Sequence, residues 1–241
     1  MLKIENAEVF GWEHAIRGMR NPMNSWEKSD SDCLFHMFQN YPNDDSMAEA
    51  YTRYLDEFGL NLKIGPNDHD LMMRLRNAGT DHRKFMRMIT VYLDITAPLY
   101  WWKEFDTYKV GTVANSCSTM HKIAAKEFTL EDFSIEHLQG VNQCKWGDSV
   151  PALVMVQIVE CLNFWRNRYL QTRDKNDWWQ IIQLLPSSYN QKRTVMLNYE
   201  VLANIYKSRR NHKLDEWHTL CDWIETLPYS KLITGKEESD K

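Results

Sequence analysis

The alternation of apolar and polar residues predicts strands at two places in the chain. Leu2–Phe10 alternates weakly, and Met86–Ile95 alternates more clearly and is rich in β-branched and aromatic residues. Both features are typical of strands. Pro98 then restricts the conformation of the residue before it, and a helix can begin directly after it. We therefore expect a sheet built early in the chain, followed by a helix from Pro98 onward.

Helical spacing dominates the second half of the chain. The longest amphipathic pattern is Val150–Thr172, where Pro151 suits the first turn of a helix. Five shorter segments have the same periodicity and are predicted as helices: Ser46–Phe58, His69–Asn77, Asp177–Leu185, Met196–Arg209 and Leu214–Thr226. The pattern predicts an α+β fold, with one modest sheet packed with long helices.

The segments between these elements carry turn and cap signals. Arg17–Ser31 is rich in Gly, Pro, Asn and Ser and is predicted to be a loop. Asn115–Lys126 is predicted to be a loop that enters a short helix. Thr129–His137 has a capping pattern with an acidic first turn, which predicts a helix start.

Length and composition indicate a single globular domain. The chain has 241 residues, of which 43% are hydrophobic and 26% are charged, which is ordinary for a folded protein with a proper core. We predict one domain over residues 1–234 and a disordered polar tail over residues 235–241. The ten Trp and eleven Tyr are numerous for this length and indicate large apolar contacts or stacking surfaces.

Charge and cysteine usage exclude several function classes. The net charge of −4 gives no global attraction to a nucleic-acid polymer or an anionic membrane. The five Cys include no CxxC pair, which argues against a disulfide framework or a zinc site. The first residues lack an apolar signal region, and no run of about 18 apolar residues exists for a membrane span. We therefore expect a cytoplasmic protein.

A first group of candidate residues lies in Pro98–His121. Aromatic residues spaced for one helix face are followed by a turn crowded with Lys, Asn, Ser and Thr. Rings that stack on a base and polar groups that bind its edges could form a pocket for a flat, anionic ligand. A buried helix followed by a polar loop explains the same residues, so their types alone leave both interpretations open.

This segment resembles the motif RHRxxSxNExSxRY of flavin-dependent thymidylate synthases, which follows a strand and a helix beginning near a Ser or Pro. Thr107 and Tyr108 stand at the first two positions of RHR, and Glu104 falls where the family commonly has Gln. The conservative or identical matches, with one extra residue admitted, are Lys109, Thr112, Asn115 and Ser118. In the family the RHR residues hold the phosphates and ring of the flavin.

Three positions are neither identical nor conservative matches to the motif. Thr107 and Met120 replace arginines, and Ser116 replaces the glutamate. Each of these two arginine replacements removes a bidentate, charge-assisted interaction with an anion. Lys109 keeps a positive charge but not the planar fork of an arginine.

A second group lies in Leu185–Arg209 and matches the same family without a gap. The family has an LP, a Tyr, and then a helix with two Asn and a terminal Arg, matched here by Pro186, Asn198, Asn204 and Arg209. On an ideal helix Asn198 and Arg209 lie within ~20° of each other. A buried Asn and Arg need partners, which neighbouring backbone or carboxylates could also supply.

The resemblance implies a role for each matched residue. Arg209 and Ser118 would be catalytic, with Arg209 contacting and polarising the uracil ring. Binding of the substrate would involve Glu104, Ser118, Arg193 and Arg209. Binding of the cofactors would involve Tyr108, Lys109, Thr112, Asn115, Asn198 and Asn204. From the loop Arg17–Ser31, Arg20 could bind the phosphate in place of the arginines that Thr107 and Met120 replace.

The resemblance also implies the reaction and the assembly. Members of the family reductively methylate dUMP to dTMP with methylenetetrahydrofolate, FAD and NADPH, as homotetramers whose active sites are built from several subunits. Two alternatives remain: hydroxymethylation of a pyrimidine nucleotide on the same fold, or a non-catalytic nucleotide-binding or structural protein. The spacing of His212, Asp215, Glu216 and His218 does not fit one helical face, so we expect no metal site.

Overall fold

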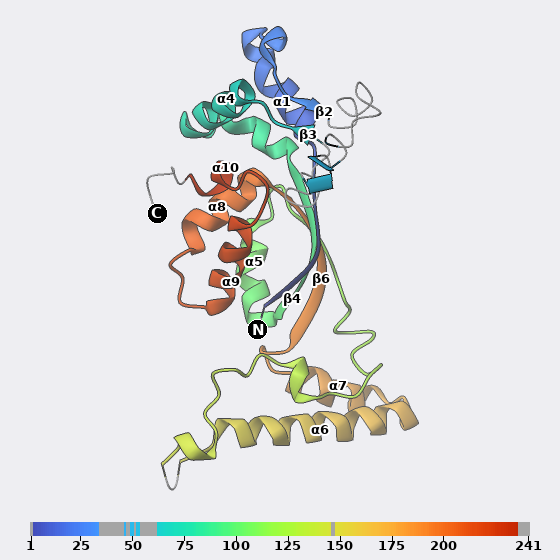
Figure 1. Ribbon diagram of the computed structural model, residues 1–241. Helices are drawn as coiled ribbons and strands as arrows, with labels where there is room; N and C mark the ends of the chain where they lie inside the picture. The colour runs from blue at the N-terminus through green and yellow to red at the C-terminus, as the bar shows by residue number, and fades with distance from the viewer. Residues whose placement is uncertain are drawn as a thin grey trace. The chain divides into compact units, whose positions relative to one another are not determined.

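The computed structural model describes residues 2–33, 46, 49–50, 52–53, 62–145 and 148–235 (Figure 1). The predicted helix Ser46–Phe58 and the predicted tail lie largely outside the described residues. No described helix is long and apolar enough to cross a membrane.

The main sheet has four strands in the order β1 (Lys3–Phe10), β4 (Thr90–Pro98), β6 (Asn190–Asn198) and β5 (Val113–Ser116). A second, two-stranded antiparallel sheet pairs β2 (Asp32–Cys33) with β3 (Leu62–Lys63). The predicted strand at Leu2–Phe10 is confirmed. The strand predicted at Met86–Ile95 begins four residues later, because Arg83–Met88 forms the 3₁₀ helix η3.

Strand β6 corrects the prediction of a helix over Met196–Arg209. Within β6 the side chains of Gln191, Val195 and Leu197 are buried, which is the two-residue period of a strand. The strand ends at Asn198, and α8 (Tyr199–Arg209) begins directly after it. The helical spacing is therefore correct for Tyr199–Arg209, but the prediction extended it three residues into the strand.

The chain divides into two compact units, and each strand of the main sheet passes from one unit to the other. Unit 1 consists of Met1–Glu5, Asp94–Thr107 and Ala114–Thr194. Unit 2 consists of Asn6–Leu93, Tyr108–Val113 and Val195–Lys241. A single domain over residues 1–234 stays a prediction.

Unit 1 is built around the long helix α6 (Pro151–Thr172), which packs against α7 (Lys175–Leu184) as Figure 1 shows. The buried cluster between these helices and the preceding segment consists of Ile123, Ala124, Phe128, Phe133, Met155, Leu162 and Ile181. The remaining elements of this unit include α5 (Leu99–Phe105), η5 (Leu130–Asp132) and η6 (Val141–Gln143).

Two predictions in unit 1 are corrected. The capping signal at Thr129 is present as a capping box, but it opens only the 3₁₀ helix η5. Phe133 then forms a β-bridge with Tyr189, and the N–H of Ser134 donates to the Ser188 carbonyl at 2.8 Å, so the backbone cannot continue as a helix. Residues 113–116, predicted partly as loop, form β5.

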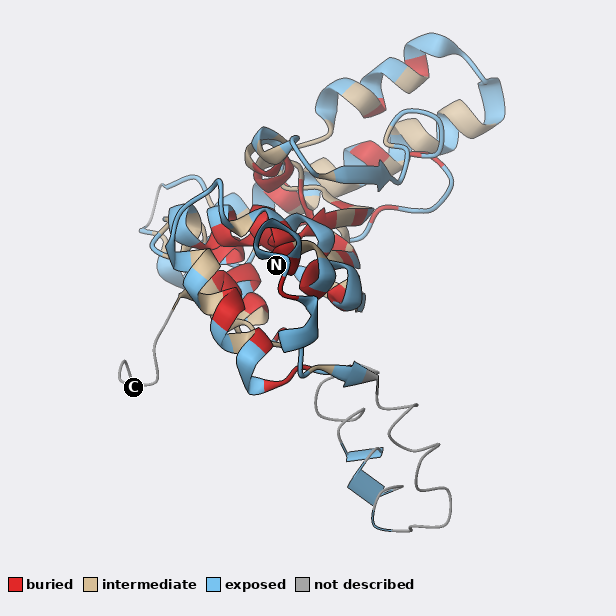
Figure 2. Ribbon diagram, turned by 90° about the horizontal axis from the view of Figure 1, so that it is seen from above, coloured by how far each residue is buried: buried red, intermediate tan, exposed pale blue. Residues whose placement is uncertain are grey.

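Unit 2 contains α1 (Trp12–Arg20), α4 (Pro66–Asn77), α8, α9 (Asp215–Glu225) and α10 (Lys231–Thr234), with η1 (Asn21–Met23) and η2 (Trp26–Lys28) after α1. Helix α1 overlaps the start of the predicted loop Arg17–Ser31, because its buried face of Trp12, Ala15, Ile16 and Met19 has helical spacing. In Figure 2 the buried positions gather in the helices and strands, whereas the connecting loops are mostly exposed.

Candidate functional site

Arg209, at the last position of α8, is held by two aromatic side chains. Its Nε donates to the hydroxyl oxygen of Tyr108 at 2.9 Å. Its guanidinium carbon lies 4.7 Å from the ring centre of Trp217 and 5.7 Å from that of Tyr108. Trp217 is fully buried on α9. A cation stacked on an indole is stabilised electrostatically, so the direction of the Arg209 side chain is set by its neighbours.

Tyr108 stands where the family has the His of RHR, and in this chain its hydroxyl group contacts Arg209. Its predicted role in binding the cofactor stays a prediction. Trp217 was not singled out by the sequence pattern. Only its position eight residues after Arg209, across a turn, could have indicated the contact.

The loop that follows Tyr108 contains a buried hydroxyl group. The backbone N–H of Thr112 donates to the carbonyl of Lys109 at 3.3 Å, which closes the turn. Gly111, at φ +80°, approaches Asn198 so closely that an added Cβ would lie 3.0 Å from its side-chain nitrogen. Among the described residues, the Oγ1 atom of Thr112 is buried without a hydrogen-bond partner. Such an atom is costly unless a ligand or water completes its hydrogen bonding.

Asn198 caps helix α8. Its side-chain oxygen accepts a hydrogen bond from the N–H of Val201 at 3.0 Å, and its side chain is 8% exposed. Asn198 itself has extended backbone angles, so the ideal-helix angle to Arg209 does not apply. An Asn at this position stabilises a helix start by about 1 kcal/mol.

Asn204 lies on a different face of α8 from Arg209. It is exposed, and its side-chain oxygen accepts a hydrogen bond from Nη2 of Arg83 at 3.0 Å. Five positions on an α-helix correspond to about 140° around its axis. The two residues therefore match the family in sequence but point toward different surroundings.

Arg20 is enclosed by unit 2. Its side chain is 4% exposed and bonds through Nε and Nη2 to Asp68, at 2.6 Å each. The same guanidinium donates to the backbone oxygens of Ser25 and Lys28. These contacts engage its Nε, Nη1 and Nη2 atoms, and a role of Arg20 in substrate binding stays a prediction.

Asp68 is the centre of a hydrogen-bond network. Burial raises the pKa of this carboxyl group, but the hydroxyls of Ser31 and Ser29 and the Arg20 guanidinium outweigh burial and leave the pKa below its ordinary value. The network joins α1 and α4 to the end of η2 and the residues that follow it, so it stabilises this part of unit 2.

In unit 1, Arg193 is held on β6. Its Nη1 lies 2.8 Å from Asp106, its Nε donates to the side chain of Gln191 at 3.0 Å, and its guanidinium lies 4.1 Å from the ring centre of Trp102. These three contacts fix its orientation, and its substrate role stays a prediction.

The other predicted residues of unit 1 are near the surface. Asn115 lies on β5 and is exposed, and Glu104 lies on α5 and is half-buried. The exposed Ser118 accepts hydrogen bonds from the N–H groups of Met120 and His121, at 3.3 and 2.9 Å. Its hydroxyl hydrogen is free to point elsewhere.

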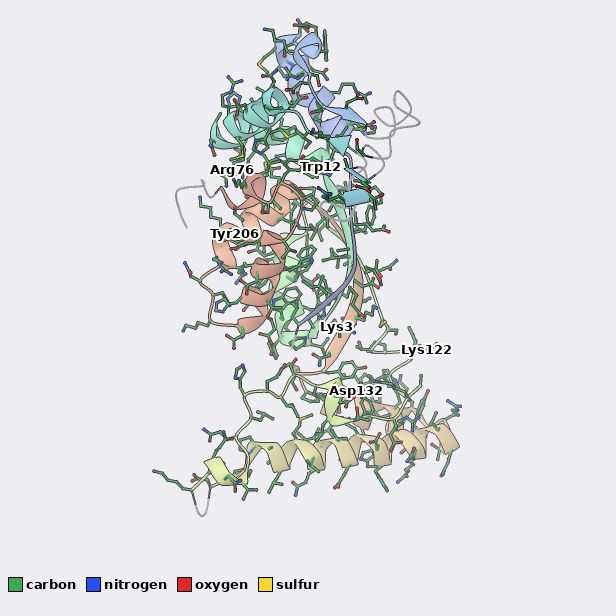
Figure 3. All side chains as sticks on the ribbon, in the orientation of Figure 1. Lys3, Trp12, Arg76, Lys122, Asp132 and Tyr206 are labelled. Carbon is green, nitrogen blue, oxygen red and sulfur yellow. The ribbon has the colours of Figure 1, made fainter. Side chains whose placement is uncertain are left out.

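Ser118 lines a cavity of about 320 Å³ in unit 1. Its wall includes Tyr189 and the ion pair between Lys126 and Asp132, and Figure 3 labels Asp132. Burial, with smaller contributions from Asp132 and Cys117, raises the pKa of Tyr189. Its phenol therefore stays protonated at neutral pH, so it can donate a hydrogen bond.

Comparison by sequence finds no match, either to a protein-family model or to a curated protein. Comparison by structure finds matches. Two structures of the flavin-dependent thymidylate synthase ThyX from Helicobacter pylori, each with FAD and dUMP, align with a TM-score of 0.62. Their sequences are 16% and 17% identical to this chain. The alignments cover 97% and 98% of this chain and 98% of each ThyX chain.

A UMP/dUMP methylase, PolB from Streptomyces cacaoi bound with 5-Br dUMP, aligns with a TM-score of 0.54 and 10% identity. The alignment covers 98% of this chain and 95% of PolB. The predicted fold class is thereby confirmed: the chain has the α+β fold of the flavin-dependent thymidylate synthases.

Proposed function

We propose that this protein binds a pyrimidine nucleotide, dUMP, and transfers a one-carbon unit to C5 of its uracil ring, as a flavin-dependent thymidylate synthase does. The arrangement that carries the proposal is Arg209, oriented by Tyr108 and stacked on Trp217. The fold shared with proteins solved with FAD and dUMP supports it.

Arg209 is the proposed catalytic residue. A guanidinium against the uracil ring stabilises the negative charge that develops when C5 becomes nucleophilic. Because the hydrogen bond to Tyr108 and the ring of Trp217 fix its direction beforehand, little reorganisation is needed during the reaction. Ser118 and Glu104 are proposed to bind the nucleotide, with Arg193 and Arg20 as further predicted contacts.

The loop after Tyr108 fits a flavin through two side chains. The hydroxyl of Thr112, buried without a partner among the described residues, offers a hydrogen bond, and the exposed Lys109 offers a positive charge. We propose that these residues, with Asn115, Asn198 and Asn204, hold the cofactor. A bound flavin supplies the hydride that completes a reductive methylation, with methylenetetrahydrofolate as carbon donor and NADPH as reductant.

The geometry of α8 supports a site shared between copies of the chain. Asn204 and Arg209 point about 140° apart on the helix, so one compact ligand cannot contact both from the same chain. In the predicted homotetramer, Asn204 of one copy and Arg209 of another can serve one site.

Hydroxymethylation of a pyrimidine nucleotide is the second candidate. It is favoured by the positions where the flavin motif is altered. Thr107 and Met120 stand where the motif has arginines, and both are exposed, so neither has been replaced to fill a core. A one-carbon transfer that ends without reduction needs no hydride from a flavin.

Titration of the purified protein with dUMP tests the proposal. We expect Arg209→Ala to weaken binding about tenfold or more, because a hydrogen bond to a charged group contributes roughly 1.5–3 kcal/mol. Arg74→Ala is the matched control, since Arg74 is exposed on α4. Equal dUMP affinity in wild type and Arg209→Ala would remove the proposed role.

Absorbance then separates the two reactions. A yellow protein that releases FAD on denaturation supports reductive methylation. A colourless protein that binds dUMP through Arg209 supports the second candidate.

A further inference from the structure

A cavity of about 740 Å³ opens in unit 2 on the Asn204 face of α8. It lies where α10 packs against both α4 and α8, and Figure 3 labels Arg76 and Tyr206 in its wall. Its charged lining consists of Arg76, Arg83, Lys207 and Arg210. The volume is within the usual range of about 300–1,000 Å³ for small-molecule sites.

Arg76 brings a positive charge for which the described residues supply no carboxylate partner. Its guanidinium donates to the carbonyls of Leu232 and Ile233, each at 3.2 Å, and to the side-chain oxygen of Asn77 at 2.9 Å. All three acceptors are uncharged. Burial, and next the charge of Arg83, lower the pKa of Arg76. A guanidinium that is partly desolvated beside another cation is less stable than in water, and a bound anion would relieve this cost.

Arg83 and Lys207 add to the excess of positive charge. Glu200 pairs with both Arg83 and Arg87, so one carboxylate serves two arginines. Lys207 is exposed and has no ion-pair partner within the described part of the chain. Arg210, by contrast, pairs with Asp222 and Glu225, so its charge is balanced.

The cavity is separate from the Arg209 cluster. Lys207 and Arg209 are two positions apart, which places their side chains about 160° apart around α8. Neither Arg209, Tyr108 nor Trp217 lines the cavity. A ligand here is therefore recognised by residues that neither motif of the thymidylate synthase resemblance includes, apart from Asn204.

We propose that this cavity binds the diphosphate group of a nucleotide. Guanidinium groups bind phosphate oxygens with two parallel hydrogen bonds and Lys adds a point charge, which Arg76, Arg83 and Lys207 provide. Ala203, Tyr206 and Ile233 give the cavity an apolar wall against which a base can pack. The identification of this nucleotide as a dinucleotide cofactor rests on the proposed function; the binding of a diphosphate group does not. These cations would then replace the arginine missing at Thr107.

Thermal unfolding and calorimetry with inorganic pyrophosphate test the site without any catalytic readout. We expect pyrophosphate to raise the melting temperature, because a ligand of the folded state stabilises it. Lys207→Gln and Arg76→Gln should each weaken pyrophosphate binding about tenfold, whereas Arg74→Ala should not. Lys207 is exposed, so its variant is not expected to disturb folding, and Gln at position 76 keeps a donor for the Leu232 carbonyl.

Three results would overturn the site: no pyrophosphate binding by the wild type, equal binding by all variants, or equal stabilisation by chloride at the same ionic strength.

FAD, NADPH and ADP then distinguish the sources of the diphosphate. If Lys207→Gln weakens binding of FAD or NADPH as it weakens pyrophosphate, the dinucleotide is supported. If Lys207→Gln weakens the binding of ADP but not that of FAD or NADPH, the identification of the ligand as a dinucleotide is overturned. Because dUMP binding through Arg209 is measured separately, failure of this proposal and failure of the proposed function give different results.

Discussion

Two arginines of unit 2, Arg20 and Arg209, were predicted to contact substrate, and the structure surrounds them differently. Arg20 is 4% exposed and bonds to the carboxylate of Asp68 and to two backbone carbonyls. Arg209 is half-buried at the end of α8, and its orientation is set by a phenol and an indole ring.

The difference shows that the partners of an arginine indicate whether its guanidinium is engaged within the fold or is available to bind a ligand. A carboxylate neutralises the guanidinium and occupies the fork with which it would bind phosphate. An aromatic face orients the same group while it keeps its charge and most of its donors. Sequence position alone does not separate these cases.

Removing the partner of Arg20 should have the largest effect on stability. We expect Asp68→Ala to lower the free energy of unfolding by about 3–5 kcal/mol, because it leaves a buried, unpaired guanidinium. Urea denaturation measures this, with Asp70→Ala as control, since Asp70 is exposed on the same helix. A decrease of less than about 1 kcal/mol, the range of exposed ion pairs, would mean that solvent reaches Arg20 and that it is available to a ligand.

Removing the phenol that holds Arg209 should have a smaller effect, and mainly on binding. Tyr108→Phe keeps the ring and removes one hydrogen bond, which is typically worth about 0.5–1.5 kcal/mol. We expect dUMP affinity to fall about threefold to tenfold with little change in unfolding free energy. If stability falls and affinity does not, Tyr108 supports the fold and does not position Arg209.

The pH dependence of stability sharpens the same comparison. The pKa of Asp68 is lowered in the folded protein from its ordinary value of 3.8. Its contribution is therefore complete above that value and disappears as pH falls through the folded-state pKa. We expect the stability gap between wild type and Asp68→Asn to be constant near pH 7 and to narrow below about pH 4. Arg209→Ala and wild type should keep a constant gap over the same range.

The smallest effect concerns the packing of α9, the helix that carries Trp217. Cys221 on this helix is buried, and burial raises the pKa of its thiol to about 11. We expect it to react with a thiol reagent far more slowly than the exposed Cys117 and Cys161. Fast modification of Cys221, identified by mass spectrometry, would show that α9 opens readily and that Trp217 is not a rigid support for Arg209.

Periodicity alone predicted most of the helices correctly, because a buried apolar stripe repeats every three to four residues. The helix at Val150–Thr172 and that at Leu214–Thr226 agree with α6 and α9 within a residue or two. Strand β6 was missed because its alternation runs directly into the helical spacing of α8, and a short segment fits both periods.

The sequence by itself determined the fold class and the spacing of Asn198, Asn204 and Arg209, since both depend on local periodicity and residue order. Only the tertiary structure decided what these residues face. Asn198 caps α8, Asn204 borders a basic cavity, and Arg209 lies on Trp217. Arg76 reaches the same cavity from a helix more than 100 residues away. Charge balance and burial arise from such long-range contacts, and no local pattern of residues records them.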